Sequence, residues 1–371
     1  MHGGYNLKRR TFLTKLLLTP KILATGALAS GTIALSPSIL KQKAAYAATK
    51  KLRWRMALGI PKTLPIWGPG IERFAKNIEI LTDGNLKIKV YGAGELVPAL
   101  ETFDAVQSGK IQMGHSAAYY WQGKIPAAPF FTAVPFNLGA LETLSWMQSA
   151  GGKALYDQMM APFGVYTLPC GATPAQMTGW FKRELNSPED LKGLKIRVPG
   201  FASAIYKAAG ASPVLIPGGE VFTSLSTGVI DAVEWVGPYH DYTLGLHKAA
   251  KYYYGPGWQE QGPVLELMMN KKSWDGLPES YQAAIEIASN DTTLWMLNEF
   301  AAKNAEYLTK IQSEGKTTVK RLPETVITKL KTLSKEVLSD ITNKDPFAKK
   351  VYDSIQSYHT KYSKTVELTS V

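Results

Sequence analysis

The sequence predicts an α/β protein built from two lobes of similar construction, with a ligand site in the cleft between them. Two segments, residues 103–115 and 222–234, share one pattern of apolar residues and glycines. The 36 residues from Glu279 to Glu314 contain no glycine or proline, so as one helix they would extend about 54 Å and span both lobes. Removing a predicted 47-residue leader leaves 324 of the 371 residues, too many for one compact core of ordinary size.

The two repeated segments predict the same local structure. In each, apolar residues three apart lead to a glycine, Gly109 or Gly228, and a short β-rich run follows. That order is typical of a helical turn, a left-handed glycine that ends the helix, and a strand. Because ligands of α/β proteins usually lie at the carboxyl ends of strands, we expect Glu234 of one half and His115 of the other to border the cleft.

The other elements follow from periodicity along the chain. Alternating apolar and polar residues predict strands, whereas apolar residues three or four apart predict helices. A further similarity links the strand predicted at 86–90 with a strand at 194–198 in the second half, which is expected to begin near Gly171. The remaining strands are expected at 54–58 and 111–116, and the helices at 71–81, 101–108, 141–160, 279–314, 324–341 and 345–362.

Residues 1–47 are expected to be an export signal rather than part of the fold. Lys8-Arg9-Arg10-Thr11-Phe12-Leu13 is a twin-arginine pattern, a weakly apolar run from Ile22 to Leu40 follows, and Ala45-Tyr46-Ala47 offers a cleavage site. This three-part layout is typical of a leader for the twin-arginine route, so a periplasmic protein is expected. The alternative is an uncleaved membrane anchor, which the glycines and Pro37 of the apolar run disfavour.

The charge distribution argues against a nucleic-acid partner. The chain carries a formal net charge of +12, but residues 1–47 hold seven basic and no acidic side chains, which leaves +5. The remaining Lys and Arg are scattered beside Glu and Asp, and no basic stripe with interleaved aromatics is present. The mild positive surplus would help to attract small anions.

Cysteine, histidine and short motifs disfavour several kinds of site. Cys170 is the single cysteine, so an intramolecular disulfide or a cysteine metal cluster is not expected, and its apolar surroundings predict a small buried side chain. The five histidines form no H-E-x-x-H or H-x-H motif, and His240 and His247 are seven apart, which disfavours zinc. A G-x-S-x-G motif and a phosphate loop are also absent, so an enzyme is not expected.

Several blocks of residues occur in an order that resembles one protein family. They are Leu96 to Val106, Met113-Gly-His115, Tyr119-Tyr120-Trp121, Phe130 to Phe136, Gln176 to Phe181, Leu194 to Arg197, Gly218-Gly219-Glu220, Glu234 to Tyr239, Lys251 to Tyr254 and Gly257-Trp258. In this order they resemble the DctP-type solute-binding proteins of tripartite ATP-independent periplasmic (TRAP) transporters. Within that family, the resemblance is to the branch that binds 2-oxo or 2-hydroxy monocarboxylates with a metal ion.

The resemblance implies a two-lobed periplasmic binding protein with a ligand cleft between its lobes and a long helix that spans both. The first lobe is expected to comprise residues 48–171 plus about 258–300. The second is expected to comprise residues 172–257 plus about 301–371, which include the C-terminal helices. Because some members pair by exchanging a C-terminal helix, a homodimer formed through the basic helix at 345–362 is a further expectation.

The resemblance also implies roles for individual residues. The arginine that matches Arg197 clamps the substrate carboxylate, which suits a planar guanidinium fork. The residues that match Gln176 and Glu234, with the backbone carbonyl of the residue that matches Trp235, hold a cation. That cation also touches the substrate carboxylate and its 2-oxygen. These hard oxygen donors suit Na⁺ or Ca²⁺ rather than zinc.

Four more residues complete the expected pocket. Glu260 matches a second pocket acid, and Tyr119 and Tyr120 are expected to come from the facing lobe and to close over the ligand. Thr173 is a departure, because this branch carries an asparagine three residues before the metal-binding glutamine. Threonine keeps a hydrogen-bonding oxygen but is shorter and lacks the amide donor, so the pocket is expected to differ in size or in its contacts with the ligand.

From the residues alone, these positions also have purely structural alternatives. Arg197 alternates with other basic residues, which is typical of a solvated strand face. Glu234 follows an apolar run, where a structural ion pair would equally explain a carboxylate. Tyr119 and Tyr120 would otherwise be core or rim packing. The side chain of Trp235 is expected to be a packing element in either case.

The expected function is capture and delivery of a small monocarboxylate, such as pyruvate or lactate. The lobes close by a hinge over the acid, no bond is made or broken, and the loaded protein docks on TRAP membrane permease subunits. A ligand-sensing periplasmic protein for a membrane receptor would share the pocket and differ only in its docking partner. A secreted carboxylate-processing enzyme that uses Glu234 and His115 as an acid–base pair would instead turn its substrate over.

Overall fold

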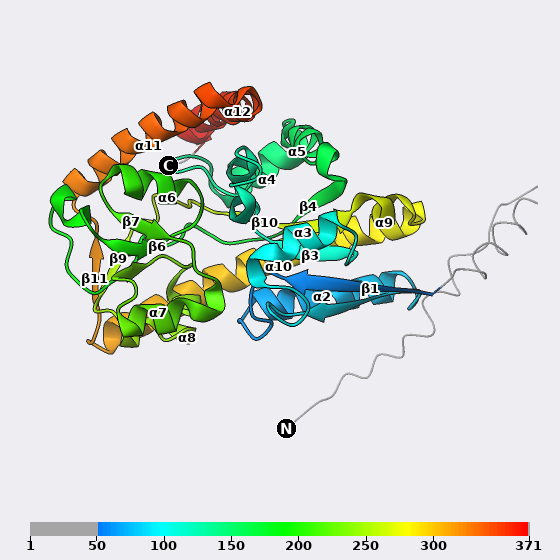
Figure 1. Cartoon of the computed structure of the whole chain (residues 1–371), viewed down its shortest axis with the longest axis horizontal. Coiled ribbons are helices and arrows are strands. Elements are labelled where there is room, and N and C mark those ends of the chain that lie inside the picture. The colour runs from blue at the N-terminus through cyan, green and yellow to red at the C-terminus, as the bar shows by residue number, and fades with distance from the viewer. Residues whose placement is uncertain (1–50, 370–371) are drawn as a thin grey trace, which may run out of the picture. The chain divides into compact units, whose positions relative to one another are not determined.

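The structure is a computed structural model that describes residues 51–369 (Figure 1). The export signal predicted at residues 1–47 lies outside the described residues. Within them, two mixed β-sheets carry helices on their faces, which confirms the predicted α/β class. Short 3-10 helices join the longer elements: η1 (Ala99–Glu101), η2 (Ala118–Trp121), η3 (Ala128–Phe131), η4 (Ala161–Phe163), η5 (Pro188–Leu191), η6 (Gly218–Glu220) and η7 (Leu246–Lys248).

The first sheet has the strand order β2-β1-β3-β10-β4. Strands β2 and β3 run parallel to β1, whereas β10 runs antiparallel to both β3 and β4. The edge strand β2 alternates buried apolar residues with exposed lysines, but the interior strand β10 is buried on both faces. The strands are β1 (Leu52–Leu58), β2 (Leu86–Tyr91), β3 (Met113–Ser116), β4 (Val165–Ala172) and β10 (Val264–Asn270), and the connecting helices are α2 (Trp67–Leu81) and α3 (Thr102–Gln107).

The second sheet has the strand order β11-β9-β5-β8-β6-β7. Its strands β7 and β8 run parallel to β6, and β5 is antiparallel to β8 and β9. The strands are β5 (Gly179–Phe181), β6 (Lys195–Arg197), β7 (Ser212–Val214), β8 (Ala232–Val233), β9 (Tyr252–Gly255) and β11 (Thr318–Arg321), and the helices are α6 (Gly200–Ala208), α7 (Val221–Thr227) and α8 (Pro238–Thr243).

The repeated helix–glycine–strand pattern is confirmed. Helix α3 is followed by Gly109 at φ 74° and strand β3, and α7 is followed by Gly228 at φ 82° and strand β8. The second similarity is wrong. The parallel orders β2-β1-β3 and β7-β6-β8 make β6 the counterpart of β1, whereas residues 86–90 form β2, the counterpart of β7. Shared alternation misled the comparison because any half-buried strand has a period of two.

The predicted helix at 141–160 is also wrong, because the structure has two helices there. Helix α4 (Ala140–Ser149) and helix α5 (Gly152–Met160) are separated by Ala150 and Gly151. Gly151 has a φ of 92°, which other residues rarely adopt. A Cβ on the following Gly152 would lie 2.7 Å from the ring of Trp146, so the sharp corner between the helices also requires glycine.

Three parts of the chain connect the two sheets. They are the β4–β5 crossing at residues 173–178, the β9–β10 crossing at residues 256–263, and helix α10 (Glu279–Ser313), which follows the short helix α9 (Lys271–Asp275). The first two lie side by side, because the Gln176 amide donates to the Glu260 carbonyl at 3.0 Å. The predicted long helix is confirmed. Helix α10 packs on β4 and α2 in the first half and on α8 in the second, and Figure 1 shows it passing along both sheets.

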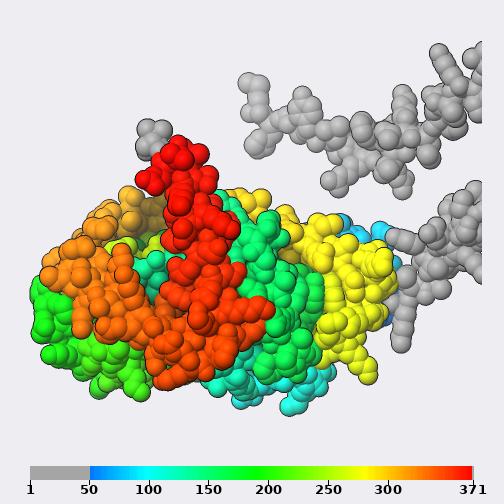
Figure 2. All heavy atoms as spheres, turned by 90° about the horizontal axis from the view of Figure 1, so that it is seen from above, coloured from blue at the N-terminus to red at the C-terminus, as the bar shows by residue number. Residues whose placement is uncertain are grey.

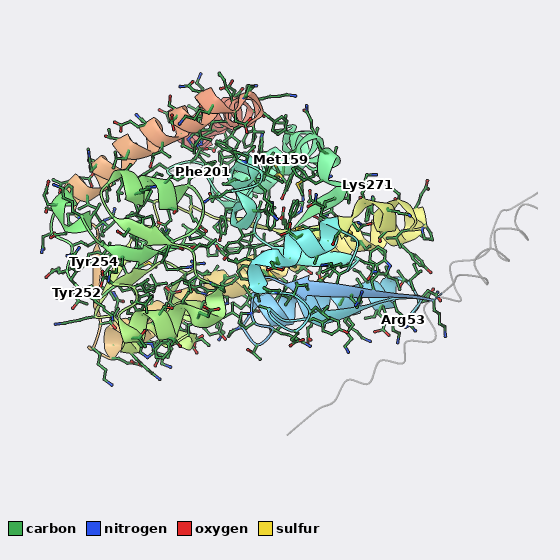
Figure 3. All side chains as sticks on the ribbon, viewed as in Figure 1. Arg53, Met159, Phe201, Tyr252, Tyr254 and Lys271 are labelled. Atoms are coloured by element: carbon green, nitrogen blue, oxygen red, sulfur yellow. The ribbon has the colours of Figure 1, made fainter. Side chains whose placement is uncertain are left out.

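The C-terminal helices also contact both halves of the described chain. Helix α11 (Glu324–Lys344) packs on α6, whereas α12 (Pro346–Thr369) packs on α4 and α5. Met159 of α5 and Phe201 of α6, labelled in Figure 3, belong to one hydrophobic cluster beneath these helices. The far end of α12 extends beyond the body of the molecule in Figure 2. Within residues 51–369, no helix combines the length and the apolar character needed to cross a bilayer.

Candidate functional site

The predicted site residues lie where parallel strands end and where the chain crosses between the sheets. Arg197 is the last residue of β6, and Glu234 directly follows the neighbouring strand β8. The Glu234 amide donates to the Arg197 carbonyl at 3.0 Å, so the carboxyl ends of these two strands are adjacent. Tyr119 and Tyr120 belong to η2, which follows β3 of the first sheet. Thr173 and Gln176 lie on the β4–β5 crossing, and Glu260 lies on the β9–β10 crossing.

Arg197 is 1% exposed, so the solvated strand face that its spacing alone would favour is wrong. Its Nε donates to the Ile216 carbonyl at 3.1 Å. Its Nη1 donates to the Glu234 carbonyl at 2.7 Å and lies 3.5 Å from the Oε2 of the same residue. Its Nη2 donates to the Tyr120 hydroxyl at 3.3 Å, and its guanidinium lies 4.9 Å from the centre of the Trp235 ring. These contacts use four of the five guanidinium N–H groups.

Two buried carboxyl groups share the surroundings of this arginine. Burial raises the pKa of Glu234 well above its usual value, the nearby Glu260 raises it further, and Arg197 opposes both effects. Burial also raises the pKa of Glu260 to about 8, again opposed by Arg197. Glu260 is connected to Gln176, whose Nε2 donates to the Glu260 Oε2 at 2.9 Å. Burial therefore favours the neutral form of both carboxyl groups, whereas Arg197 favours their ionised forms, as a cation bound beside them would.

The two halves of the chain meet directly at this site. The Arg197–Tyr120 bond joins β6 of the second sheet to η2 of the first. The ring of Tyr119 packs over the start of α6, where a Cβ on Gly200 would lie 3.3 Å from it. Burial raises the pKa of the Tyr119 hydroxyl, and the charge of Glu260 adds to that increase. These tyrosines close the site from the facing half.

The oxygen atoms at the site suit a hard cation better than a soft metal. Gln176 Oε1 and Glu234 Oε1 are buried and have no hydrogen-bond partner among the described residues. Unpaired buried oxygens of this kind are costly unless a donor or a cation satisfies them. Across residues 51–369, no group of three or more His, Cys, Asp or Glu is placed to hold a metal ion. The available set is one carboxylate with neutral amide and carbonyl oxygens, which is typical of Na⁺ or Ca²⁺ ligands.

Glycines shape the walls around the Trp235 and Gln176 backbones. A Cβ on Gly218 would lie 2.1 Å from the ring of Trp235, so glycine lets that ring pack against η6. A Cβ on Gly257 would lie 2.1 Å from the carbonyl oxygen of Gln176. The ring of Trp235 is buried, as predicted for a packing element.

His115 does not face Glu234 as an acid–base partner. Its Nδ1 accepts from Trp67 Nε1 at 2.9 Å, so its Nε2 carries the proton and donates to the Cys170 carbonyl at 2.6 Å. The ring is fully buried, and burial lowers its pKa to about 4. Both nitrogens are occupied by structural bonds, so the enzyme alternative loses its proposed pair. The single Cys170 is buried, as its apolar neighbours predicted.

Sequence reasoning missed Asp241, which is buried next to the Glu234–Trp235 segment. Asp241 accepts hydrogen bonds from Trp180, Tyr253 and two backbone amides. The sequence did show an acid shortly after the Glu234–Trp235 pair, in the first turn of a helix that begins at Pro238. Any surface helix begins with such residues, so the pattern by itself does not indicate burial.

A groove of about 790 Å³ lies away from this site, along the edge strand β2. It is lined mainly by charged side chains, including Arg53, which Figure 3 places at the N-terminal start of β1. None of the predicted site residues lines it. Exposed lysines on an edge strand also serve to prevent sheet-to-sheet association.

Known proteins match most of the chain. Residues 60–345 match the family described as bacterial extracellular solute-binding protein, family 7. The monocarboxylate 2-oxoacid-binding periplasmic protein of Nostoc sp. is 40% identical over 339 residues, which cover 91% of this chain and 93% of that relative. A crystal structure of a TRAP periplasmic solute binding protein from Pseudoalteromonas atlantica, with bound sodium and pyruvate, is 38% identical with a TM-score of 0.84 and covers 86% of this chain and 97% of its own.

A second solved structure agrees with the first. The TRAP periplasmic solute binding protein from Colwellia psychrerythraea, with bound calcium and pyruvate, is 36% identical with a TM-score of 0.84. The match covers 86% of this chain and 98% of that chain. These likenesses confirm the resemblance drawn from the ordered sequence blocks and the two-lobed fold that it implied. The chain therefore belongs to family 7 of the bacterial extracellular solute-binding proteins, whose members with solved structures include TRAP transporter solute-binding proteins.

Proposed function

We propose that this protein captures a small monocarboxylate, a 2-oxo acid such as pyruvate or the related lactate, and delivers it to a TRAP membrane permease. The observation that carries the proposal is a pair of buried contacts, Arg197 with Glu234 and Gln176 with Glu260, whose charges affect one another, together with the Arg197–Tyr120 contact from the facing half. The Nostoc relative and the two crystal structures, which name 2-oxo acids and pyruvate, support this class of ligand.

Arg197 is the proposed anchor for the ligand carboxylate. Its guanidinium is rigidly held by the Ile216 and Glu234 carbonyls, which leaves the Nη2 end directed toward Tyr120. A carboxylate at that end would accept from the remaining N–H, beside the Arg197–Tyr120 contact. A monocarboxylate also suits a site that already contains two acids, because a second ligand charge would be repelled.

Gln176, Glu234 and the Trp235 carbonyl are the proposed ligands of a Na⁺ or Ca²⁺ ion. Their fit rests on the two buried oxygens, Gln176 Oε1 and Glu234 Oε1, that lack a partner among the described residues. When bound, such an ion supplies positive charge that offsets the two acids and holds the carboxylate and 2-oxygen of the ligand. Thr173 would act indirectly, because its Oγ1 lies 3.5 Å from Gln176 Nε2.

Capture is proposed to occur by closure of two lobes that meet at the Tyr119–Tyr120 face. The lobes are the predicted ones: residues 48–171 plus about 258–300, and 172–257 plus about 301–371. The paired crossings at residues 173–178 and 256–263 would serve as the hinge, because they are the short connections between the two sheets. No bond is made or broken in this cycle, so the protein acts as a binding subunit rather than an enzyme.

Export and assembly complete the proposal. The twin-arginine pattern at Lys8-Arg9-Arg10 would carry the chain to the periplasm, with cleavage after Ala47. Helix α12 would form a homodimer by exchange with a second copy, which its projecting end supports (Figure 2). A sensor that hands its signal to a membrane receptor would share the pocket, so co-purification with a permease or with a receptor separates these two functions.

Calorimetry with purified protein tests the proposal. Pyruvate, other 2-oxo acids and lactate are titrated in Na⁺ or Ca²⁺ buffer, and Arg197→Lys is compared with Lys195→Ala, an exposed residue on the same strand. Lysine keeps the charge but loses the fork, so we expect binding to weaken by about 2 kcal/mol, roughly thirtyfold. The Lys195→Ala protein should bind like the wild type. Absence of binding by every small carboxylate would end the proposal, and unchanged affinity in Arg197→Lys would remove Arg197 from the site.

A further inference from the structure

Asp241 lies in the second half of the chain and is 1% exposed. Its carboxylate accepts four hydrogen bonds. Its Oδ1 accepts from the backbone amides of Val236 at 3.2 Å and Gly237 at 3.1 Å. Its Oδ2 accepts from Trp180 Nε1 at 3.0 Å and from the Tyr253 hydroxyl at 2.9 Å. One oxygen therefore holds the backbone that follows Glu234–Trp235, and the other is held by two stacked rings.

The bond to the Val236 amide fixes more than one atom. The Val236 N–H and the Trp235 C=O belong to the same peptide unit, which is planar and trans. In such a unit the N–H and the C=O point in opposite directions. Because Asp241 Oδ1 holds the Val236 N–H, it turns the Trp235 carbonyl oxygen away from Asp241 and fixes its direction.

The same segment is held at its other end and on its side chain. The Val236 carbonyl accepts from the Met177 amide at 3.3 Å, and Met177 directly follows Gln176. The ring of Trp235 packs where any Cβ on Gly218 would collide with it. The backbone that carries the Trp235 carbonyl is therefore connected to the chain that carries Gln176.

We propose that Asp241 is a positioning residue that aims the Trp235 carbonyl oxygen at the cation site and so sets the affinity for the cation. The inference rests on the proposed function, in which that carbonyl is a cation ligand. It assigns Asp241 no contact with the ion or with the substrate. Asp241 acts by orienting the peptide unit, so its effect on cation affinity depends on the acceptor atom Oδ1 and not on the negative charge of the carboxylate.

Substitutions at Asp241 and Tyr253 separate the role of the Oδ1 acceptor from the role of the negative charge. Asp241→Ala removes both acceptors. Asp241→Asn keeps one acceptor, which we expect to face the two backbone amides, while its NH₂ group faces the rings. There the Tyr253 hydroxyl can turn to accept, whereas the Trp180 N–H, which can only donate, loses its acceptor, so we expect this variant to lose stability but to keep the direction of the Trp235 carbonyl. Tyr253→Phe leaves Asp241 and the backbone bonds intact and removes only one ring donor.

The experiment is calorimetric titration of each variant with CaCl₂ alone and then with CaCl₂ in the presence of pyruvate, after a thermal melt has shown that the variant is folded. We expect Asp241→Ala to weaken calcium binding at least tenfold, and Asp241→Asn and Tyr253→Phe to stay within threefold of the wild type. A folded Asp241→Ala protein with wild-type calcium affinity overturns the inference. Equal losses in Asp241→Asn and Asp241→Ala also overturn it, because they would assign the effect to charge.

A measurement on the unaltered protein keeps the inference testable if Asp241→Ala does not fold. Amide hydrogen exchange is followed at Val236 and Gly237 without cation and with saturating calcium. We expect both amides to be protected before calcium is added, and the protection to change less than threefold on addition. Rapid exchange that slows only with calcium would mean that the ion, rather than Asp241, orders the segment, and would overturn the inference.

The two proposals fail in different ways. If the wild-type protein binds neither calcium nor any small carboxylate, the proposed function fails whatever the variants do. If the wild-type protein binds both and the Asp241 variants do not differ, only the positioning role fails.

Discussion

Replacing Tyr120 with phenylalanine removes a single contact between the two halves of the molecule. The Tyr120 hydroxyl accepts from Arg197 Nη2 at 3.3 Å. Tyr120 belongs to η2 in the first half, and Arg197 belongs to β6 in the second. The ring that remains keeps its packing against Tyr119, whose centroid lies 4.7 Å away. The substitution therefore tests whether this bond holds the closed form together.

The expected magnitude follows from the geometry. A hydrogen bond to a charged group contributes about 1.5–3 kcal/mol net, and the 3.3 Å distance places this one at the lower end. A loss of about 1.5 kcal/mol corresponds to roughly tenfold weaker ligand binding. Because the contact exists only when the two halves meet, we expect the change mainly in the dissociation rate.

The assay is calorimetry with pyruvate in calcium or sodium buffer, combined with stopped-flow dissociation. Tyr119→Phe is the matched control, because no hydrogen bond of the Tyr119 hydroxyl is formed among the described residues, although its ring lies beside the same site. We expect Tyr119→Phe to bind within twofold of the wild type. An affinity of Tyr120→Phe within twofold of the wild type, or equal losses in both variants, would refute the reasoning.

Three further predictions concern charge, space and pH. Glu234→Gln removes the one carboxylate among the proposed cation ligands, so calorimetry should show calcium binding weakened at least about tenfold while the thermal melt without calcium stays cooperative. Gly257→Ala places a Cβ 2.1 Å from the Gln176 carbonyl oxygen, so urea unfolding should show a loss of about 1–3 kcal/mol, whereas Gly123→Ala, with open space around it, should change little. The pKa of His115 is lowered to about 4 from 6.5, so its contribution to stability is present above pH 6.5 and is lost as the pH falls toward 4. His115→Gln should therefore flatten the acid dependence of the unfolding free energy by about 1.4 kcal/mol per pH unit between pH 6 and 5, and an unchanged slope in urea titrations would contradict it.

Periodicity predicted elements in both halves but did not predict others, such as β4, β9, β10 and α6, and its two wrong predictions have local causes. The span from 141 to 160 has helical spacing on both sides of Gly151, but the left-handed backbone of that glycine divides it into α4 and α5. The match of residues 86–90 to 194–198 failed because alternation specifies a half-buried strand without specifying its neighbours. Only the sheet order shows that β6 corresponds to β1.

At the candidate site, too, some residues could be predicted from the sequence and others could not. Arg197, Glu234 and Gln176 were named from ordered blocks that resemble a family. From the residues alone, Arg197 favoured a solvated strand face, a structural ion pair would equally explain Glu234, and Gln176 carried almost no signal. Asp241 was not named, because an acid near the start of a helix is typical of any surface helix. Its role depends on Trp180, Tyr253 and the backbone of Val236, which come from three separate parts of the chain.

The sequence by itself determined the α/β class, the repeated helix–glycine–strand units, the long helix α10 and the family. These follow from contacts within a few residues, from glycine conformations and from the order of sequence blocks. Only the tertiary structure decided that Arg197 is buried against Glu234, that His115 has both nitrogens occupied, and that Asp241 holds the Trp235 peptide. Burial and hydrogen-bond partners at the site depend on residues far apart in the chain, 84 positions for Gln176 and Glu260 and 77 for Arg197 and Tyr120. These pairings are fixed by how the two sheets and their crossings pack.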